Sequence, residues 1–75
     1  MFLSELTLGK IAVIVRINCT NTFKNRLADI GVIEGCEVKV LRVAPLKDPI
    51  EIKVKSFRLA IRKNDAKKIE VSCYD

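Results

Sequence analysis

Short segments in which apolar and polar residues alternate run through most of the chain. They cover residues 10–17, 37–43, 50–54, 57–61 and 69–73, and Ile, Val and Leu dominate their apolar positions. A period of two residues is typical of β-strands that bury one face. Five short strands with no regular strand–helix–strand rhythm predict a mainly β fold, a closed or partly open antiparallel barrel.

In the first strand the alternation predicts which side chains are buried. We expect a core face made of four β-branched residues, Ile11, Val13, Val15 and Ile17. The opposite face, half covered, would carry Ala12, Ile14 and Arg16. Because the edges of a small barrel can pair with another copy of the chain, Ile14 is a candidate contact in a homo-oligomer.

A helical period interrupts the strands once, over residues 22–30. Phe23, Leu27 and Ile30 recur at i, i+4 and i+7, the spacing of one helical face. The polar residues before Phe23 offer N-cap side chains, and Gly31 can take the positive φ that ends a helix. We expect this short helix to pack on the barrel as a lid through its three apolar residues.

The remaining segments predict a bent strand and a hairpin. The alternation changes phase within residues 37–43, which indicates a bulge or sharp bend. Residues 44–49 form a loop with two prolines, and residues 50–54 and 57–61 form a hairpin. A single helical turn near residues 64–66 is expected to be capped by Asn64.

Composition and charge exclude several classes of protein. With 75 residues there is room for one domain, residues 1–75, and 49% hydrophobic content suits a small aliphatic core. No stretch approaches the roughly 20 apolar residues of a membrane-spanning helix, and the N-terminus lacks the features of a signal peptide. The cysteines number only three, which is both too few and an odd number for a disulfide framework. We therefore expect a soluble, cytoplasmic protein with reduced thiols and no membrane insertion.

The chemistry that catalysis requires is missing from the sequence. There is no histidine, the commonest general base, and no C-x-x-C or glycine-rich phosphate-binding motif. Glu34 and Glu37 flank a turn on an exposed edge, which is a poor setting for an acid/base pair. A metal site from Cys19, Cys36 and Cys73 would need three separated strand ends to converge. We expect no enzyme activity, no cofactor and no metal site, although weak metal sensing through these carboxylates or thiols stays open.

Three segments resemble the FeoA family, the small accessory proteins of bacterial ferrous-iron uptake. The first is RLADIGVIEGCEV at residues 26–38, similar to the helix-to-strand passage of that family. The second is the hairpin, PIEIKV at residues 49–54 followed by FRLAIR at residues 57–62. The third is the closing segment with Ala66 and the sequence IEV at residues 69–71. With LG at residues 8–9, the similarity covers nearly the whole chain in the same order.

This resemblance implies an SH3-like barrel and a bacterial cytoplasmic protein. It also implies a partner, FeoB, which is the ferrous-iron permease of the membrane with a cytoplasmic GTPase domain. The implied role is to assist or regulate that transporter, without catalysis. The sequence departs from the family pattern at Glu34, where Pro is common, and at Ser56, where a hairpin Gly is usual.

Four residues are candidates for binding a protein partner: Arg26, Leu46, Arg58 and Arg62. SH3-like barrels commonly bind extended peptides between loops, and the candidate rims are the helix and the loop of residues 45–49. Leu46 would either anchor a partner or cover the barrel mouth. Arg26 would grip a carboxylate of the partner or pair locally with Asp29.

The two C-terminal arginines of this set belong to a basic surface on the hairpin. That surface, which also includes Lys53 and Lys55, would be either a solvated strand face or a means of attracting an acidic partner. With the net charge of +5 it also leaves two rival functions. A nucleic-acid-binding barrel would need exposed aromatic residues for stacking, but the predicted core takes Phe23 and Phe57. A regulatory domain of an iron-dependent repressor would follow a DNA-binding region, and here we expect the barrel to begin at the N-terminus.

Overall fold

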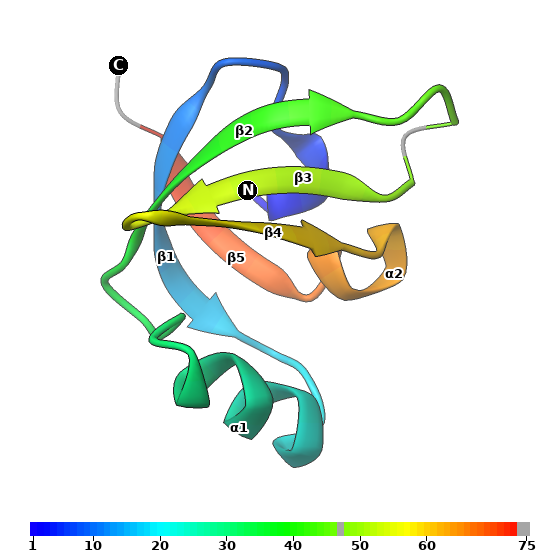
Figure 1. The fold of residues 1–75 in the computed structure, drawn as a ribbon. Coiled ribbons are helices and arrows are strands. Elements are labelled where there is room, and N and C mark those ends of the chain that lie inside the picture. The colour runs from blue at the N-terminus through cyan, green and yellow to red at the C-terminus, as the bar shows by residue number, and fades with distance from the viewer. Residues whose placement is uncertain (47, 74–75) are drawn as a thin grey trace.

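A curled five-stranded antiparallel sheet makes up most of the computed structural model, which describes residues 1–46 and 48–73 (Figure 1). The strands are β1 (Ile11–Ile17), β2 (Glu37–Val43), β3 (Ile50–Val54), β4 (Phe57–Ile61) and β5 (Ile69–Cys73). Their order across the sheet is β4-β3-β2-β1-β5, and every neighbouring pair is antiparallel. The predicted mainly β architecture is confirmed.

The core lies inside the curl of the sheet and is built from aliphatic side chains. Its strand residues are Ala12, Ile14, Ile17, Val38, Val40, Ile50, Ile52, Val54, Ile61, Ile69 and Val71. In β2, β3 and β5 the buried residues occupy alternate positions, because successive side chains of a strand point to opposite faces. The hairpin of β3 and β4 therefore buries Ile50, Ile52 and Val54 as expected, while Phe57 and Leu59 are half-buried.

The predicted core face of β1 is wrong. Ala12 and Ile14 are buried, whereas Val15 is 47% exposed. The register of β1 against β5 shifts between Ile14 and Arg16. This irregularity adds a residue to one strand, so that Ile17 returns to the inner face three positions after Ile14. Because both faces of β1 are apolar, the alternation alone could not tell which one was inner.

The burial of Ile14 removes the proposed contact between two copies of the chain. Ile14 is only 1% exposed, so its side chain belongs to the core and cannot contact a second molecule. The exposed aliphatic residue of this strand is Val15.

The bend expected in residues 37–43 is present. The register of β2 against β3 shifts between Val40 and Arg42, at the point where the alternation of the sequence changes phase. The β3–β4 hairpin turns at Lys55 and Ser56, and Lys55 has a φ of +56°. The left-handed conformation usual for a glycine is therefore taken by Lys55, the residue before Ser56.

Helix α1 (Asn21–Asp29) lies at the end of the sheet where β1 finishes (Figure 1). Thr20 is its N-cap, and its side chain accepts a hydrogen bond from the Phe23 N–H at 3.4 Å. Of the three residues of the predicted apolar face, only Leu27 is buried. Phe23 is half-buried and Ile30 is exposed. Packing of Ile30 on the barrel was therefore a wrong expectation.

The first eight residues also take part in the fold, although no strand or helix was predicted there. Leu3–Glu5 form a 3₁₀ helix, η1, which places Leu3 and Leu6 in the core. The Glu5 carboxylate accepts a hydrogen bond from the Phe2 N–H at 2.6 Å, and the Met1 carbonyl accepts one from the Val71 N–H at 2.7 Å. None of the helices within residues 1–46 and 48–73 is long and apolar enough to cross a lipid bilayer.

The second helix, α2 (Lys63–Ala66), begins one residue earlier than predicted, and its cap is different. Its N-cap position is Arg62, and Asn64 lies inside the helix. A carboxylate from a distant loop replaces the predicted cap, because Asp48 Oδ1 accepts a hydrogen bond from the Lys63 N–H at 3.0 Å. This contact joins the β2–β3 loop to α2 and satisfies one of the free N–H groups at the helix start.

We expect Asp48→Ala to lower the free energy of unfolding by about 1 kcal/mol, the usual effect of losing such a cap. Asp48→Asn keeps an acceptor oxygen and should retain most of the stability. Urea denaturation of both variants beside the parent protein measures the difference. Equal stability of the Ala variant and the parent would show that the Asp48 contact contributes nothing.

Candidate functional site

Three basic residues lie in one row across the outer face of the sheet. In the strand register Lys39 of β2 is opposite Lys53 of β3, and Lys53 is opposite Arg58 of β4. All three side chains are exposed. Their neighbours along β2 and β3, such as Val38 and Ile52, are buried, which places the row on the outside of the barrel. We call Lys39, Lys53 and Arg58 the basic row.

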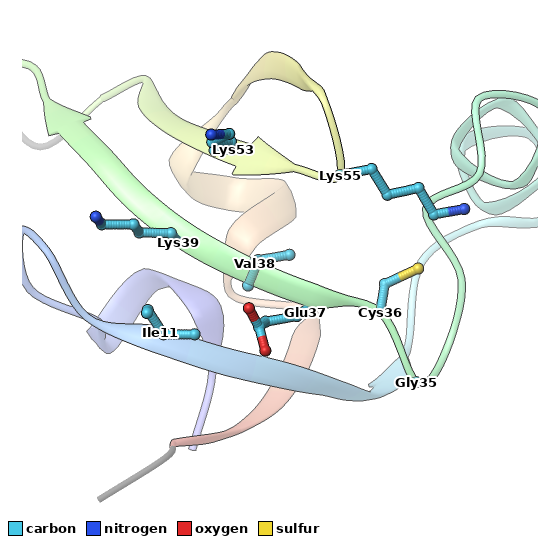
Figure 2. A pocket seen from close by; sticks show the side chains of 8 residues that line it. All are labelled: Ile11, Gly35, Cys36, Glu37, Val38, Lys39, Lys53 and Lys55. Atoms are coloured by element: carbon cyan, nitrogen blue, oxygen red, sulfur yellow. The ribbon is translucent and has the colours of Figure 1, made fainter.

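A hollow of about 510 Å³ includes two residues of the basic row, Lys39 and Lys53, whereas Arg58 lies outside its lining (Figure 2). Its lining combines Ile11, Gly35, Cys36, Glu37, Val38, Lys39, Lys53 and Lys55. Ile11 of β1 is directly opposite Lys39, so the row continues into a half-buried aliphatic side chain. The hollow therefore offers cations, one carboxylate and an apolar side chain within one surface.

Lys55 and Cys36 lie at one end of this hollow, and Figure 2 shows Lys55 extending from the hairpin turn toward the segment that precedes β2. Its Nζ is 3.1 Å from the position that a Cβ at Gly31 would occupy. The Cys36 thiol donates a hydrogen bond to the Gly31 carbonyl, with an Sγ–O distance of 3.1 Å. Gly31, which has a φ of +89°, thus leaves room for the Lys55 ammonium group.

Of the four predicted binding residues, only Arg58 lies in the basic row. Arg62 follows β4 at the start of α2, and Arg26 is on α1. Leu46 lies in the β2–β3 loop and is 86% exposed, so it does not cover the barrel mouth. All four residues are exposed, but the structure does not bring them together into one site.

The two predicted rims line separate hollows instead of one groove. Beside α1, a hollow of about 270 Å³ is lined by Ile17, Lys24, Ala28, Val32, Ile33 and Glu34. Beside the β2–β3 loop, a hollow of about 200 Å³ is lined by Arg42, Ala44, Pro45, Pro49, Glu51 and Ala60. In Figure 1 that loop lies away from α1, which excludes a peptide groove formed by the two together.

Lys39 is the member of the basic row that the sequence analysis missed. The sequence could have indicated it, because Lys39 stands between Val38 and Val40, which are both buried, and must therefore face outward. Its pairing with Lys53 depends on the β2–β3 register, which the alternation alone does not provide.

The three cysteines, Cys19, Cys36 and Cys73, are free and half-buried in the structure. Partial burial is the main reason that the pKa of Cys19 lies above its ordinary value. The nearby Asp65 carboxylate raises this pKa further, and Lys68 partly offsets the effect. A raised pKa keeps the thiol protonated near neutral pH, which is unfavourable for a nucleophile or a metal ligand.

The carboxylates and thiols proposed for weak metal sensing do not form a cluster. Within residues 1–46 and 48–73 there is no group of three or more His, Cys, Asp or Glu side chains that could hold a metal ion. Cys36 donates to the Gly31 carbonyl, and the Cys73 Sγ lies 3.3 Å from the Met1 thioether sulfur.

Comparison with known proteins identifies one family. A family model described as the FeoA domain matches residues 1–73. The chain is 39% identical over 71 residues to an Fe(2+) transport protein A/Fe(2+) transporter FeoB fusion protein of Porphyromonas gingivalis, covering 95% of this chain and only 8% of that protein. It is 32% identical over 72 residues to a Campylobacter jejuni protein named as an Fe(2+) transport protein A, covering 96% of this chain and 97% of the relative.

Solved structures agree with this assignment. The solution structure of the FeoA protein from Chlorobium tepidum superposes with a TM-score of 0.95 at 39% identity, covering all of this chain and 71% of that one. A zinc complex of Stenotrophomonas maltophilia FeoA, described as a procaryotic SH3 domain protein, gives a TM-score of 0.80 at 32% identity, with 96% and 89% of the two chains covered. The predicted SH3-like barrel is confirmed.

A manganese-dependent transcriptional repressor shares the fold as well. Its TM-score is 0.88 at 19% identity, and the match covers 99% of this chain and 41% of the repressor. At this identity the likeness concerns the fold alone.

Proposed function

The chain belongs to the FeoA domain family, and from this membership we propose that it is an accessory protein of ferrous-iron uptake that binds the cytoplasmic part of a FeoB-type transporter. In this role residues 1–75 act as one non-catalytic domain in the cytoplasm. The family assignment agrees with the lack of histidine and of phosphate-binding motifs in the sequence.

One observation supports this partner above others. In the Porphyromonas gingivalis relative, an Fe(2+) transport protein A and the transporter FeoB are fused in a single polypeptide. Fusion holds two modules at a high effective concentration, which is useful when the two must meet in order to work. A separate chain of the same family would reach its transporter by binding it.

We expect the protein to bind the soluble GTPase domain of FeoB from the same organism with a saturable heat signal in titration calorimetry. The measurement is made at about 0.15 M salt and repeated at higher salt, because screening weakens contacts between exposed charges at long range. A mixed RNA is the control ligand, and it should give no saturable signal.

Heat with RNA alone, decreasing steeply as salt rises, would contradict the proposal and favour a nucleic-acid-binding barrel. If neither ligand gives a signal, the same titration with full-length FeoB in detergent decides. Absence of binding to the complete transporter would also contradict the proposed function.

A further inference from the structure

The basic row carries charges that the sheet could have neutralised. Lys53 has a basic residue directly opposite on each side, Lys39 on β2 and Arg58 on β4. Side chains in such positions have Cβ atoms about 5 Å apart, and like charges directly opposite destabilise a sheet. The neighbouring row of the same face pairs Arg42 with Glu51, so opposite charges are compatible with this surface.

A like-charged row of this kind needs a reason beyond the stability of the sheet. Natural proteins often keep locally unfavourable arrangements where function depends on them. A bound group of negative charge would attract Lys39, Lys53 and Arg58 and so offset the repulsion among them.

The spacing of the row fits an extended acidic segment. Neighbouring strands are about 4.8 Å apart, so the backbone positions of the three basic residues span about 10 Å. In an extended peptide alternate side chains lie about 7 Å apart on one face. Two carboxylates at alternate positions of a segment crossing β2, β3 and β4 would therefore each lie between two of the basic side chains.

The other residues of the hollow favour a peptide over a nucleic acid. The Glu37 carboxylate also lines the hollow and would repel a phosphate backbone, whereas a peptide can place a basic or neutral residue beside it. Ile11, at the end of the row, offers an apolar contact. None of the described aromatic residues lines the hollow, so the stacking surface typical of single-stranded nucleic-acid binding is missing there.

We propose that the basic row, with Ile11 and Lys55 at its margins, binds an extended acidic segment of a protein partner that carries Asp or Glu at alternate positions. The inference rests on the proposed function in one respect, that the segment belongs to the cytoplasmic part of the FeoB-type transporter. The chemistry of the row itself concerns any peptide with this pattern.

The decisive variant is Lys53→Glu, because it separates binding from folding. A glutamate between Lys39 and Arg58 creates two favourable pairs, so the melting temperature should rise by about 4 °C. Affinity for the FeoB GTPase domain should fall by about tenfold or more, because the new carboxylate faces those of the partner. A more stable protein that binds more weakly cannot be explained by damage to the fold.

Lys67→Glu is the matched control. Lys67 is exposed at the end of α2 and does not line the hollow, and both variants lower the net charge of +5 by two units. If the basic row is the binding surface, Lys67→Glu should retain the affinity of the parent within about twofold, since it changes only the long-range field. Equal losses of affinity in the two variants would overturn the proposal, and the proposed partnership with FeoB would stand.

A second probe tests the row without the transporter. A synthetic peptide with Glu at alternate positions is titrated into the isotopically labelled protein, and a mixed RNA is titrated in parallel. We expect the peptide to shift the backbone amide resonances of residues 39, 53 and 58, and Lys53→Glu to abolish the shifts. If the peptide shifts these resonances but FeoB does not bind, the row is supported and the proposed function fails.

Two results with this probe would overturn the inference. One is the absence of shifts at the row when peptide is present in large excess. The other is RNA binding that Lys53→Glu abolishes, because the row would then be a nucleic-acid surface.

Discussion

Ile14→Ala should lower the free energy of unfolding by about 3 kcal/mol, whereas Val15→Ala should lower it by less than about 1 kcal/mol. Ile14 is 1% exposed within the barrel, and shortening it leaves a cavity in a core that cannot fully collapse. Val15 is 47% exposed on the outer face, so its substitution removes little buried area and costs mainly β-propensity.

The measurement is urea denaturation of both variants and the parent at one temperature. A domain of this size is expected to have a total free energy of unfolding of only about 4–11 kcal/mol, so Ile14→Ala removes a large share of it. If it does not fold, Ile14→Val, with an expected loss of about 1 kcal/mol, keeps the comparison measurable. A larger loss for Val15→Ala than for Ile14→Ala would contradict the register of β1 and restore the core face predicted from the sequence.

Leu3→Ala should be the other severe variant, with an expected loss of about 3 kcal/mol. Leu3 has no exposed surface in the 3₁₀ helix η1, where it packs with the core formed by the strands. Leu8→Ala is a control with the same chemical change, because Leu8 is 66% exposed and should lose less than about 0.5 kcal/mol.

Thermal and urea unfolding of these two variants measure whether the N-terminal residues belong to the cooperative unit. If Leu3→Ala unfolds like the parent protein, η1 does not contribute to the stability of the barrel. Equal losses at the two positions would contradict the different burial of Leu3 and Leu8.

All five strands could be located from the sequence, and in β2 to β5 the buried face could be predicted as well because the two faces of each strand differ in chemistry. In β3, for example, Ile50, Ile52 and Val54 alternate with charged residues, so only one choice of buried face is reasonable. The bend in β2 could be predicted as well, because the alternation of its apolar residues changes phase. The structure has its register shift at that point. Family membership followed from the order and spacing of the segments, and the whole-chain match confirms it.

The residues of the proposed binding surface could be predicted from the sequence only in part. Arg58 was found because it faces outward on a clear strand, but Lys39 was missed and Arg26, Leu46 and Arg62 lie elsewhere on the surface. Which outward residues become neighbours depends on the alignment of one strand with the next. A one-residue change in that alignment would place different side chains together.

The sequence by itself determined the number of strands, the position of the hairpin and the lack of histidine chemistry, because these depend on local periodicity and residue type. Only the tertiary structure decided the inner face of β1, the Asp48 cap of α2 and the basic row. The physical reason is the same in each case. Burial, capping and charge neighbours arise between residues distant in the chain, and their positions are set by strand register and packing.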